Sequence, residues 1–404
     1  MTGRDWNSGT GGGENETTGR RIARARKRRG LTQTGLAAKA NVSRSLIAQV
    51  EAGHKPATPS FVAAVARACA VDAAEINGQP YRGSDKRSDA VHAAVPAVRR
   101  ALAYADISPE VETPPRSLDE LALELSRLQK LQGAAAHLSL GGRLPAITEE
   151  LTVHTVESGV PRSWRLLNRA YAMAASLTRR LGYHDLAQVA VERASAAAQR
   201  AEDPHLRHLV ALSRALLLLT LGSEDIALAM VRRTAAEVDR STSVGLEVYG
   251  ALHLRAAVSA ARLGRRTVAW EHHGLAAEAV ARINPRDRRD PYGLQSNPFN
   301  VVIHGCAVAT ELGDHDRAVR LDAEFRPPPA LYAERRAHHE IDMARSHLWL
   351  NHYDRALKRI LNAEQIAPQM VRLHPTAREV VRQLGVYHRS VPEELRRLEN
   401  RMVF

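Results

Sequence analysis

The chain has few cysteines, few aromatic residues and no long apolar run. Its only two cysteines, Cys69 and Cys306, lie far apart, so we expect no disulfide framework and a reducing, cytoplasmic setting. No apolar run approaches the roughly 20 residues that span a bilayer, so no membrane partner is predicted. The Gly-rich start, residues 1–16, lacks the apolar segment of a signal peptide and is predicted to be disordered.

Signals for β-strands are almost absent. Aromatic residues make up 4% of the chain, and it lacks the alternating runs of Val, Ile and Thr that mark strands. Alanine and leucine dominate instead. We therefore predict an all-α fold. At 404 residues we also predict more than one domain, because one core rarely organises a chain of this length.

The charge balance favours a polyanionic partner. The formal net charge is +13, which suits DNA, RNA or an anionic membrane surface. The positive surplus is concentrated in residues 17–80, where eleven Lys or Arg residues stand against three acidic residues. The remainder of the chain is closer to balance, so the polyanion is expected at this block.

Composition divides the chain into four parts. They are a disordered tail at 1–16, a compact basic block at 17–80, a connector at 81–116 and a helical domain at 117–404. The connector is rich in Pro and Gly, yet residues 85–106 have a helical pattern and could pack on either neighbouring domain. The last part begins with a predicted capping box, in which Ser117 and Glu120 close the first turn of a helix.

Five short helices are predicted in the basic block. Gly30, Asn41 and Gly53 follow three of them and favour helix ends. The predicted helices cover 18–29, 33–40 and 44–52, with a fourth that opens at Thr58-Pro59 and a short fifth that is capped by Asp72. Thr32 and Ser43 are the predicted N-caps of the second and third helices.

The second and third helices form a predicted helix-turn-helix unit. Its buried apolar set comprises Leu36, Ala37, Ala40, Val42, Ile47 and Val50. The third helix keeps a polar face on which Arg44, Ser45 and Gln49 project together. Arg pairs with guanine, Gln pairs with adenine, and Ser adapts to either. We therefore predict that these three side chains contact bases in the major groove of double-stranded DNA.

Further polar residues around this unit are candidates for contacts with DNA phosphates. They are Arg20, Arg21, Gln33, Ser43, His54 and Lys55. Taken alone, the basic run 20–29 also fits a solvated face or an arm that binds polyanions without sequence preference. For Arg44, Ser45 and Gln49 the alternative is a purely surface role.

Several short motifs between residues 18 and 78 match a known pattern. They are Leu31-Thr32-Gln33, Leu36-Ala37, Val42-Ser43-Arg44-Ser45, Ile47 and Val50-Glu51-Ala52-Gly53. This segment resembles the phage-repressor-like XRE family of helix-turn-helix regulators. The resemblance implies that Gln33 touches the DNA backbone, that the third helix faces bases, and that Glu51 pairs internally with Arg26. Gly35 departs from the helix-favouring residue usual there, which weakens the second helix by about 1 kcal/mol.

An internal repeat occupies most of the remaining chain. Each copy has Leu-Gly or Leu-Asn between two predicted helices, followed by Ala: Leu181-Gly182 with Ala187, Leu221-Gly222 with Ala227, Leu263-Gly264 with Ala269, Leu312-Gly313 with Ala318, and Leu350-Asn351 with Ala356. The copies recur at intervals of 40, 42, 49 and 38 residues. Gly or Asn supplies the left-handed residue that ends one helix, and Ala lets the next helix pack closely. Each copy therefore predicts a helix hairpin.

Stacked hairpins would bury faces that no single hairpin could bury, and would form a right-handed solenoid with an inner groove. This pattern resembles the tetratricopeptide repeat, and residues 363–368 are similar to the end of such a unit. The spacing is longer than that family's period, which implies elongated, irregular repeats. The alternative is a plain helical bundle whose Leu-Gly endings are unrelated helix stops.

The whole architecture resembles large actinobacterial regulators and the peptide-pheromone receptors called RRNPP regulators. The resemblance rests on residues 249–257, 311–314 and 336–339 with Asp342, and on Asn300 with His304. In such receptors the array sets dimer geometry and holds a peptide. We expect the array of this chain to hold a peptide, small-molecule or protein effector. Asn300, His304 and, more weakly, Asn297 are the candidate effector contacts. The alternative is a helix cap for Asn297 and buried hydrogen bonds for the other two.

No residue set indicates catalysis or a cofactor. Histidines and carboxylates cluster at 338–342, but only His338 and Asp342 share a helix face, and neither an HExxH motif nor a cysteine pair occurs. We expect no metal site, no cofactor and no enzymatic activity.

Together these patterns predict a cytoplasmic, nucleoid-associated transcription regulator. It would bind a palindromic operator as a homodimer, because one recognition helix contacts few bases, and the repeats would supply dimer contacts and an effector groove. The competing prediction is a protein-interaction scaffold or antitoxin-like partner, in which the repeats grip another protein.

Overall fold

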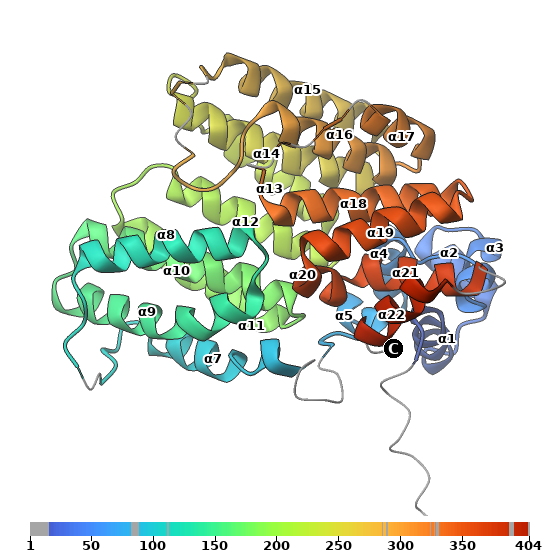
Figure 1. The fold of residues 1–404 in the computed structure, drawn as a ribbon, viewed down its shortest axis with the longest axis horizontal. Coiled ribbons are helices and arrows are strands. Elements are labelled where there is room, and N and C mark those ends of the chain that lie inside the picture. Colours follow the sequence, from blue (N-terminus) through green and yellow to red (C-terminus); the bar gives the residue numbers. More distant parts are fainter. Residues whose placement is uncertain are drawn as a thin grey trace, which may run out of the picture.

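The computed structural model describes residues 16–81, 89–110, 113–284, 286–287, 290–323, 325–326, 328, 331–387 and 392–402. Within these ranges the regular structure is helical and no strand occurs. A small N-terminal domain is followed by a long array of helices (Figure 1). The all-α prediction is confirmed. Of the predicted disordered tail, residues 1–15 lie outside the described residues.

The N-terminal domain, residues 16–81, is called the head below. Its helices are α1 (Thr18–Arg28), α2 (Gln33–Ala40), α3 (Arg44–Glu51), α4 (Pro59–Cys69) and α5 (Ala73–Asn77). Ile22, Leu36 and Ile47 are fully buried and join α1, α2 and α3 to α4 in one core. Val42 packs against this core but remains partly exposed. The first three helices lie within one residue of their predicted bounds.

Side chains at the helix starts explain these boundaries. Four hydroxyl groups cap α1 to α4, and each accepts the N–H of the residue three places on: Thr17, Thr32, Ser43 and Thr58. Each cap satisfies a donor that the first turn leaves free. Asp72 precedes α5, but its side chain makes no capping hydrogen bond. Asp72 therefore occupies the predicted N-cap position without the capping hydrogen bond.

The connector is partly helical and packs on the array. It contains a short 3-10 turn, η1 (Ala90–His92), and α7 (Val95–Tyr104). Pro96 lies in the first turn of α7, where its missing N–H removes no helical hydrogen bond. Val98 and Leu102 join the core formed by the first helices of the array. Residues 82–88, where the predicted connector helix begins, lie outside the described residues.

The array continues to the C-terminal end of the described chain. Its helices are α8 (Leu118–Gly133), α9 (His137–Glu157), α10 (Pro161–Arg180), α11 (His184–Arg200), α12 (Leu206–Thr220), α13 (Glu224–Ala236), α14 (Ser243–Arg262), α15 (Arg266–Arg282), α16 (Pro298–Glu311), α17 (His315–Ala323), α18 (Ala333–Trp349), α19 (Tyr353–Ile366), α20 (Pro368–Leu373), α21 (Pro375–Tyr387) and α22 (Glu393–Met402). Successive helices pair as hairpins, and α10, α12, α14, α16 and α18 also touch one another in order. These five helices are called the inner row below. No helix in the described ranges is long and apolar enough to cross a bilayer.

The turns of the hairpins have the geometry that the repeat predicts. The φ angles are 87° at Gly182, 76° at Gly222, 71° at Gly264, 74° at Gly313 and 59° at Asn351, all in the left-handed region. The Ala that follows each of them five residues later is at most 1% exposed. The predicted left-handed turn is confirmed in all five copies.

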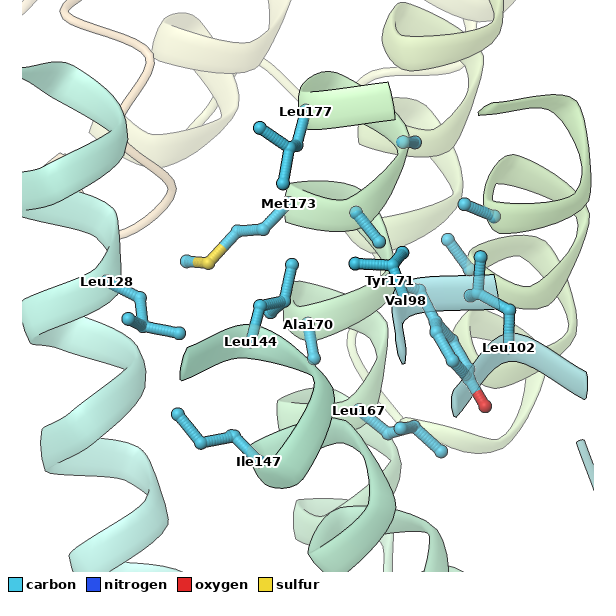
Figure 2. Packing of buried hydrophobic residues seen from close by; sticks show 14 of the residues in the cluster. Val98, Leu102, Leu128, Leu144, Ile147, Leu167, Ala170, Tyr171, Met173 and Leu177 are labelled. Carbon is cyan, nitrogen blue, oxygen red and sulfur yellow. The ribbon is translucent and has the colours of Figure 1, made fainter. Parts of the chain in front are cut away.

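The largest apolar cluster lies at the start of the array. Side chains from α7, α8, α9 and α10 meet there (Figure 2). Leu128, Leu144 and Leu167 are at most 1% exposed, and burial of each such side chain is worth about 2 kcal/mol. The predicted capping box at the start of α8 is confirmed, because Ser117 and Glu120 each accept the other's backbone N–H.

The array curls so that its later helices return to its first ones. Helix α18 contacts α8, and Tyr332 packs against Gly133, where a Cβ atom would lie 2.8 Å from the ring. Arg180 of α10 forms an ion pair with Glu334 of α18. The inner row therefore surrounds a space instead of lining an open groove.

The head closes one side of this space. Gln383 of α21 donates to the carbonyl of Gly53 at 2.9 Å, beside the end of α3 (Figure 1). On another side Arg67 of α4 pairs with Glu224 of α13 at 3.3 Å. Gly222, in the turn before α13, abuts the head so closely that a Cβ atom there would lie 2.8 Å from the Cβ of Ala63. The head is thus docked on two separate parts of the array.

Candidate DNA-binding surface

The turn between α2 and α3 fixes the orientation of α3 in the head. Asn41 takes a left-handed conformation with φ 52°, which Asn tolerates better than most residues. Ile47 and Val50 then turn inward, at 0% and 2% exposure. Because these two positions face the core, the opposite face of α3 is directed outward.

The outward face carries the three predicted base-reading residues. Arg44 and Ser45, on the first turn of α3, are exposed, and Gln49 is partly exposed. Gln49 donates from Nε2 to the hydroxyl of Ser45 at 3.3 Å, so the structure brings these two side chains together. Arg44 has no ion pair with any described residue, which leaves its guanidinium able to take guanine O6 and N7 as a fork.

The start of α3 also suits a phosphate contact. Ser43 is exposed, and its hydroxyl oxygen accepts the N–H of Leu46 at 3.1 Å. The hydroxyl hydrogen is not used by this cap and can donate to an anion. The helix dipole adds a partial positive charge at the same end.

An internal ion pair supports α3 from behind. Glu51 accepts hydrogen bonds from Arg26 at 2.7 and 2.9 Å and from Gln33 at 2.9 Å. Burial would raise the pKa of the Glu51 carboxyl, but the hydrogen bonds from Arg26 and Gln33 hold it below its usual value. The same hydrogen bond to Glu51 raises the pKa of Arg26. The pair implied by the family resemblance is present, and the amide of Gln33 is engaged in it.

The remaining phosphate candidates differ in availability. Arg20 and His54 are exposed. Arg21 is not, because its guanidinium donates to the carbonyls of Ile76 at 2.7 Å and Asn77 at 3.1 Å and so closes the end of α5. No local pattern indicates this use of Arg21, because Ile76 lies 55 residues further along the chain.

The end of α3 leads directly into the contact with the array. The carbonyl of His54 accepts a hydrogen bond from the hydroxyl of Tyr387, and the ammonium of Lys55 lies 4.7 Å from the ring centroid of Trp349. Lys55 therefore has a partner within the chain. The structure places it at the joint between head and array.

Two cations that the sequence analysis did not single out also lie on the head surface. Lys27 of α1 and Lys39 of α2 are exposed and have no ion pair with any described residue. Other cations of the basic run are engaged: Arg28 pairs with Glu75 at 2.6 Å, and Arg29 donates to the carbonyl of Ala70 at 2.7 Å. The helical periodicity of α1 and α2 places both lysines on an outward face, and this signal in the sequence could have identified them as exposed cations.

The three candidate effector residues have separate roles. Asn297 caps α16 by accepting the N–H of Asn300 at 2.9 Å. The Asn300 side chain is buried, with its amide 3.5 Å from the carbonyl of Leu294. Only His304 lines the cavity enclosed by the array, and its Nδ1 contacts the carbonyl of Asn300 at 2.8 Å. The structure therefore does not bring the three candidate effector contacts together at the cavity.

The histidine and acid cluster of α18 divides between two environments. His338 faces Asp342, with Nδ1 3.8 Å from the carboxylate, and both line the cavity. His339 instead contacts Asp322 of α17 at 2.7 Å. The described residues contain no group of three or more His, Cys, Asp or Glu side chains placed to hold a metal ion.

Comparison with known proteins identifies the head alone. A family model described as a helix-turn-helix domain matches residues 18–77. No curated protein and no solved structure matches the chain. The head is thus a helix-turn-helix domain. In proteins that bind DNA through such a domain, the second helix of the helix-turn-helix unit lies in the major groove; the corresponding helix of this chain is α3.

Proposed function

We propose that this chain is a sequence-specific transcription regulator that binds double-stranded DNA through α3. The observation that carries the proposal is the division of α3 into two faces. Ile47 and Val50 are locked in the head core, whereas Arg44 and Ser45 are exposed beside Gln49. Arg, Ser and Gln are side chains that read base edges.

Charge and family match support the same proposal. The match to a helix-turn-helix model covers the head, and the chain carries a net charge of +13. Arg20 and Lys27 on α1 and Lys39 on α2 are exposed and would neutralise phosphates. The proposal assigns the chain no catalytic role or cofactor, and it places the chain in the cytoplasm, on the nucleoid.

We further propose that two chains bind one palindromic operator. A single helix of eight residues contacts few base pairs, and pairing of two heads supplies the specificity that a genome requires. In this proposal the array holds the two heads at a fixed spacing and binds the effector. Light scattering of the chain on its DNA would give the mass of two chains, whereas the mass of one chain would contradict the dimer.

Selection of DNA fragments tests the central claim. Purified full-length chain is mixed with random duplexes, and the retained fragments are sequenced. We expect a shared motif with two inverted half-sites, and we expect Arg44→Ala to relax the preference at one position in each half-site. Arg320→Ala, a matched control on exposed α17, should select the unchanged motif. Retained fragments without a shared motif would contradict the proposal.

The competing interpretation is a scaffold whose array grips another protein. A stoichiometric protein partner that copurifies with the chain, together with indifference to DNA sequence, would favour it. The structure offers no observation that favours it over DNA binding, so it is kept as an outcome of the selection experiment.

A further inference from the structure

The space between the inner row and the head is a cavity of about 450 Å³. Every helix of the inner row contributes side chains to its wall, and the head closes it with residues such as Pro59, Val62 and Ala63 of α4. Cavities of this size hold small molecules. A long peptide would need a larger or more open groove.

Arginine dominates the polar part of the wall. Seven arginines line the cavity against four carboxylates. The carboxylates are already paired: Glu334 with Arg180, Glu311 with Arg345 at 3.3 Å and with Arg262 at 3.4 Å. The other two, Asp342 and Glu379, face His338 and Arg382.

Four cavity arginines, Arg169, Arg179, Arg255 and Arg335, form no ion pair with a described residue. Arg169 donates to the amide oxygen of Gln129 at 2.9 Å. The other three, Arg179 of α10, Arg255 of α14 and Arg335 of α18, share the influence of Glu334, which is already paired with Arg180.

The Nε–H groups of Arg255 and Arg335 are buried and have no acceptor. Buried donors in proteins are almost always satisfied. The Nε–H groups of Arg262 and Arg345 in the same wall also lack an acceptor, so unsatisfied donors gather around this cavity.

The charges of Arg335 and Arg179 act on Arg255. Burial is the main cause that lowers the pKa of Arg255 to about 9, and repulsion from Arg335 and then Arg179 adds to the lowering. Burial likewise lowers the pKa of Arg179 to about 9, with Arg180 as the next cause. Both residues are partly exposed and line the cavity. The fold thus holds like charges close together at a cost, which an anion between them would remove.

Other lining residues restrict the ligand further. Leu209, Leu216 and Ile303 supply apolar surface to the same cavity. Burial, followed by Arg335 and Arg255, keeps the pKa of His304 well below its usual value. The neutral His304 donates from Nδ1 to the Asn300 carbonyl, which leaves Nε2 as an acceptor. The cavity therefore suits a molecule with anionic, apolar and hydrogen-bond-donating parts.

We propose that this cavity is a binding site for a small oxyanion with phosphate or carboxylate groups, held by Arg179, Arg255 and Arg335. Guanidinium groups bind both kinds of oxyanion through forked hydrogen bonds. The proposal deepens the effector role given above and rests on the proposed function for its regulatory meaning. Because the head forms part of the wall, the bound molecule touches both head and array.

Titration calorimetry on the full-length chain tests the site. Inorganic pyrophosphate and citrate serve as probes in separate titrations, in a buffer free of phosphate, so that the two oxyanion classes are distinguished. We expect saturable binding of at least one probe with one site per chain. Arg255→Met and Arg335→Met should each weaken it about ten- to hundred-fold, the loss expected for one charged hydrogen-bonding group.

Arg320→Met is the matched control, because it removes the same charge from the exposed surface of α17. It should leave probe binding unchanged. Absence of saturable binding by both probes would overturn the proposal, and so would equal weakening by Arg320→Met and Arg255→Met, which would indicate attraction to net charge alone.

Melting temperature without any probe gives a second measurement. If the arginines are held for a ligand, Arg255→Met should melt at the same temperature as wild type or higher, since it removes an unpaired buried charge. Melting well below wild type for both Arg255→Met and Arg335→Met would indicate a structural role and overturn the proposal. DNA selection with the same samples separates the claims: selected DNA without probe binding refutes the cavity site alone, and probe binding without selected DNA refutes the regulator.

Discussion

The head and the cavity treat buried arginine in opposite ways. In the head, Arg26 is matched by Glu51 and Arg21 by the carbonyls that end α5. In the cavity, Arg255 and Arg335 have buried Nε–H groups without acceptors. Arg26 and Arg21 of the head therefore have partners within the chain, and the unpaired cations of the head, such as Arg44, lie on the surface, where water solvates them. The cavity is incomplete, and that difference indicates where a partner inside the molecule is required.

The same substitution in the two regions should have opposite effects on stability. Arg26→Met leaves the carboxylate of Glu51 buried with only Gln33 as a partner, and we expect a loss of about 3 kcal/mol in the free energy of unfolding. Arg255→Met should raise that free energy or leave it unchanged. Urea denaturation of both variants checks this. A similar loss of stability in both variants would contradict the claim that Arg26 stabilises the fold and Arg255 does not.

Exposed Arg44 should matter for DNA affinity and not for stability. We expect Arg44→Ala to weaken binding to the selected operator by about 1 to 3 kcal/mol and to relax base preference at one position. Its free energy of unfolding should remain within about 0.5 kcal/mol of wild type. Fluorescence anisotropy on the operator and on single-base variants, with urea denaturation in parallel, measures both. A clear loss of stability in Arg44→Ala would show that Arg44, like Arg26, supports the fold, and would contradict its assignment to DNA binding alone.

The Arg26–Glu51 pair should make the head sensitive to acid. The pKa of Glu51 is lowered in the folded chain, so its contribution to stability is present above the unfolded pKa. That contribution is lost as the pH falls through the folded pKa. Urea midpoints between pH 7 and pH 3 should fall more steeply for wild type than for Glu51→Gln. Parallel curves would show that the pair contributes no pH-dependent stability.

The smallest effects are expected for Arg20, a candidate phosphate contact, and for Lys55, which lies between head and array. Their substitutions should differ in the salt dependence of DNA binding. Arg20→Ala should reduce the slope of log affinity against log salt by about 0.9, because one phosphate contact is lost. Lys55→Ala should leave this slope unchanged, since its ammonium lies over Trp349, and should lower stability by about 0.5 to 1 kcal/mol. A reduced salt slope for Lys55→Ala would instead show that Lys55 contacts a DNA phosphate.

Local features could be predicted from the sequence, and long-range contacts could not. Thr32, Ser43 and the left-handed glycine at 222 depend on their own turns, so the residue type alone determines them. The docking of Gly222 against Ala63 joins positions far apart in the chain, and no local pattern encodes it. The same holds for the use of Arg21 within the head and for the contact of Lys55 with Trp349.

The effector site shows the same limit. Asn300 and His304 lie one turn apart, which suggested a shared face. The structure directs Asn300 into buried contacts and leaves only His304 at the cavity. Arg179, Arg255 and Arg335 come from three different helices, and only the curvature of the array brings them together.

The most direct test of the central claim is the ratio of affinities for the selected operator and for a scrambled duplex, measured at one salt concentration. We predict a ratio on the order of 1,000 or more for wild type and a ratio about 5- to 150-fold smaller for Arg44→Ala. A wild-type ratio near one would contradict DNA reading by α3.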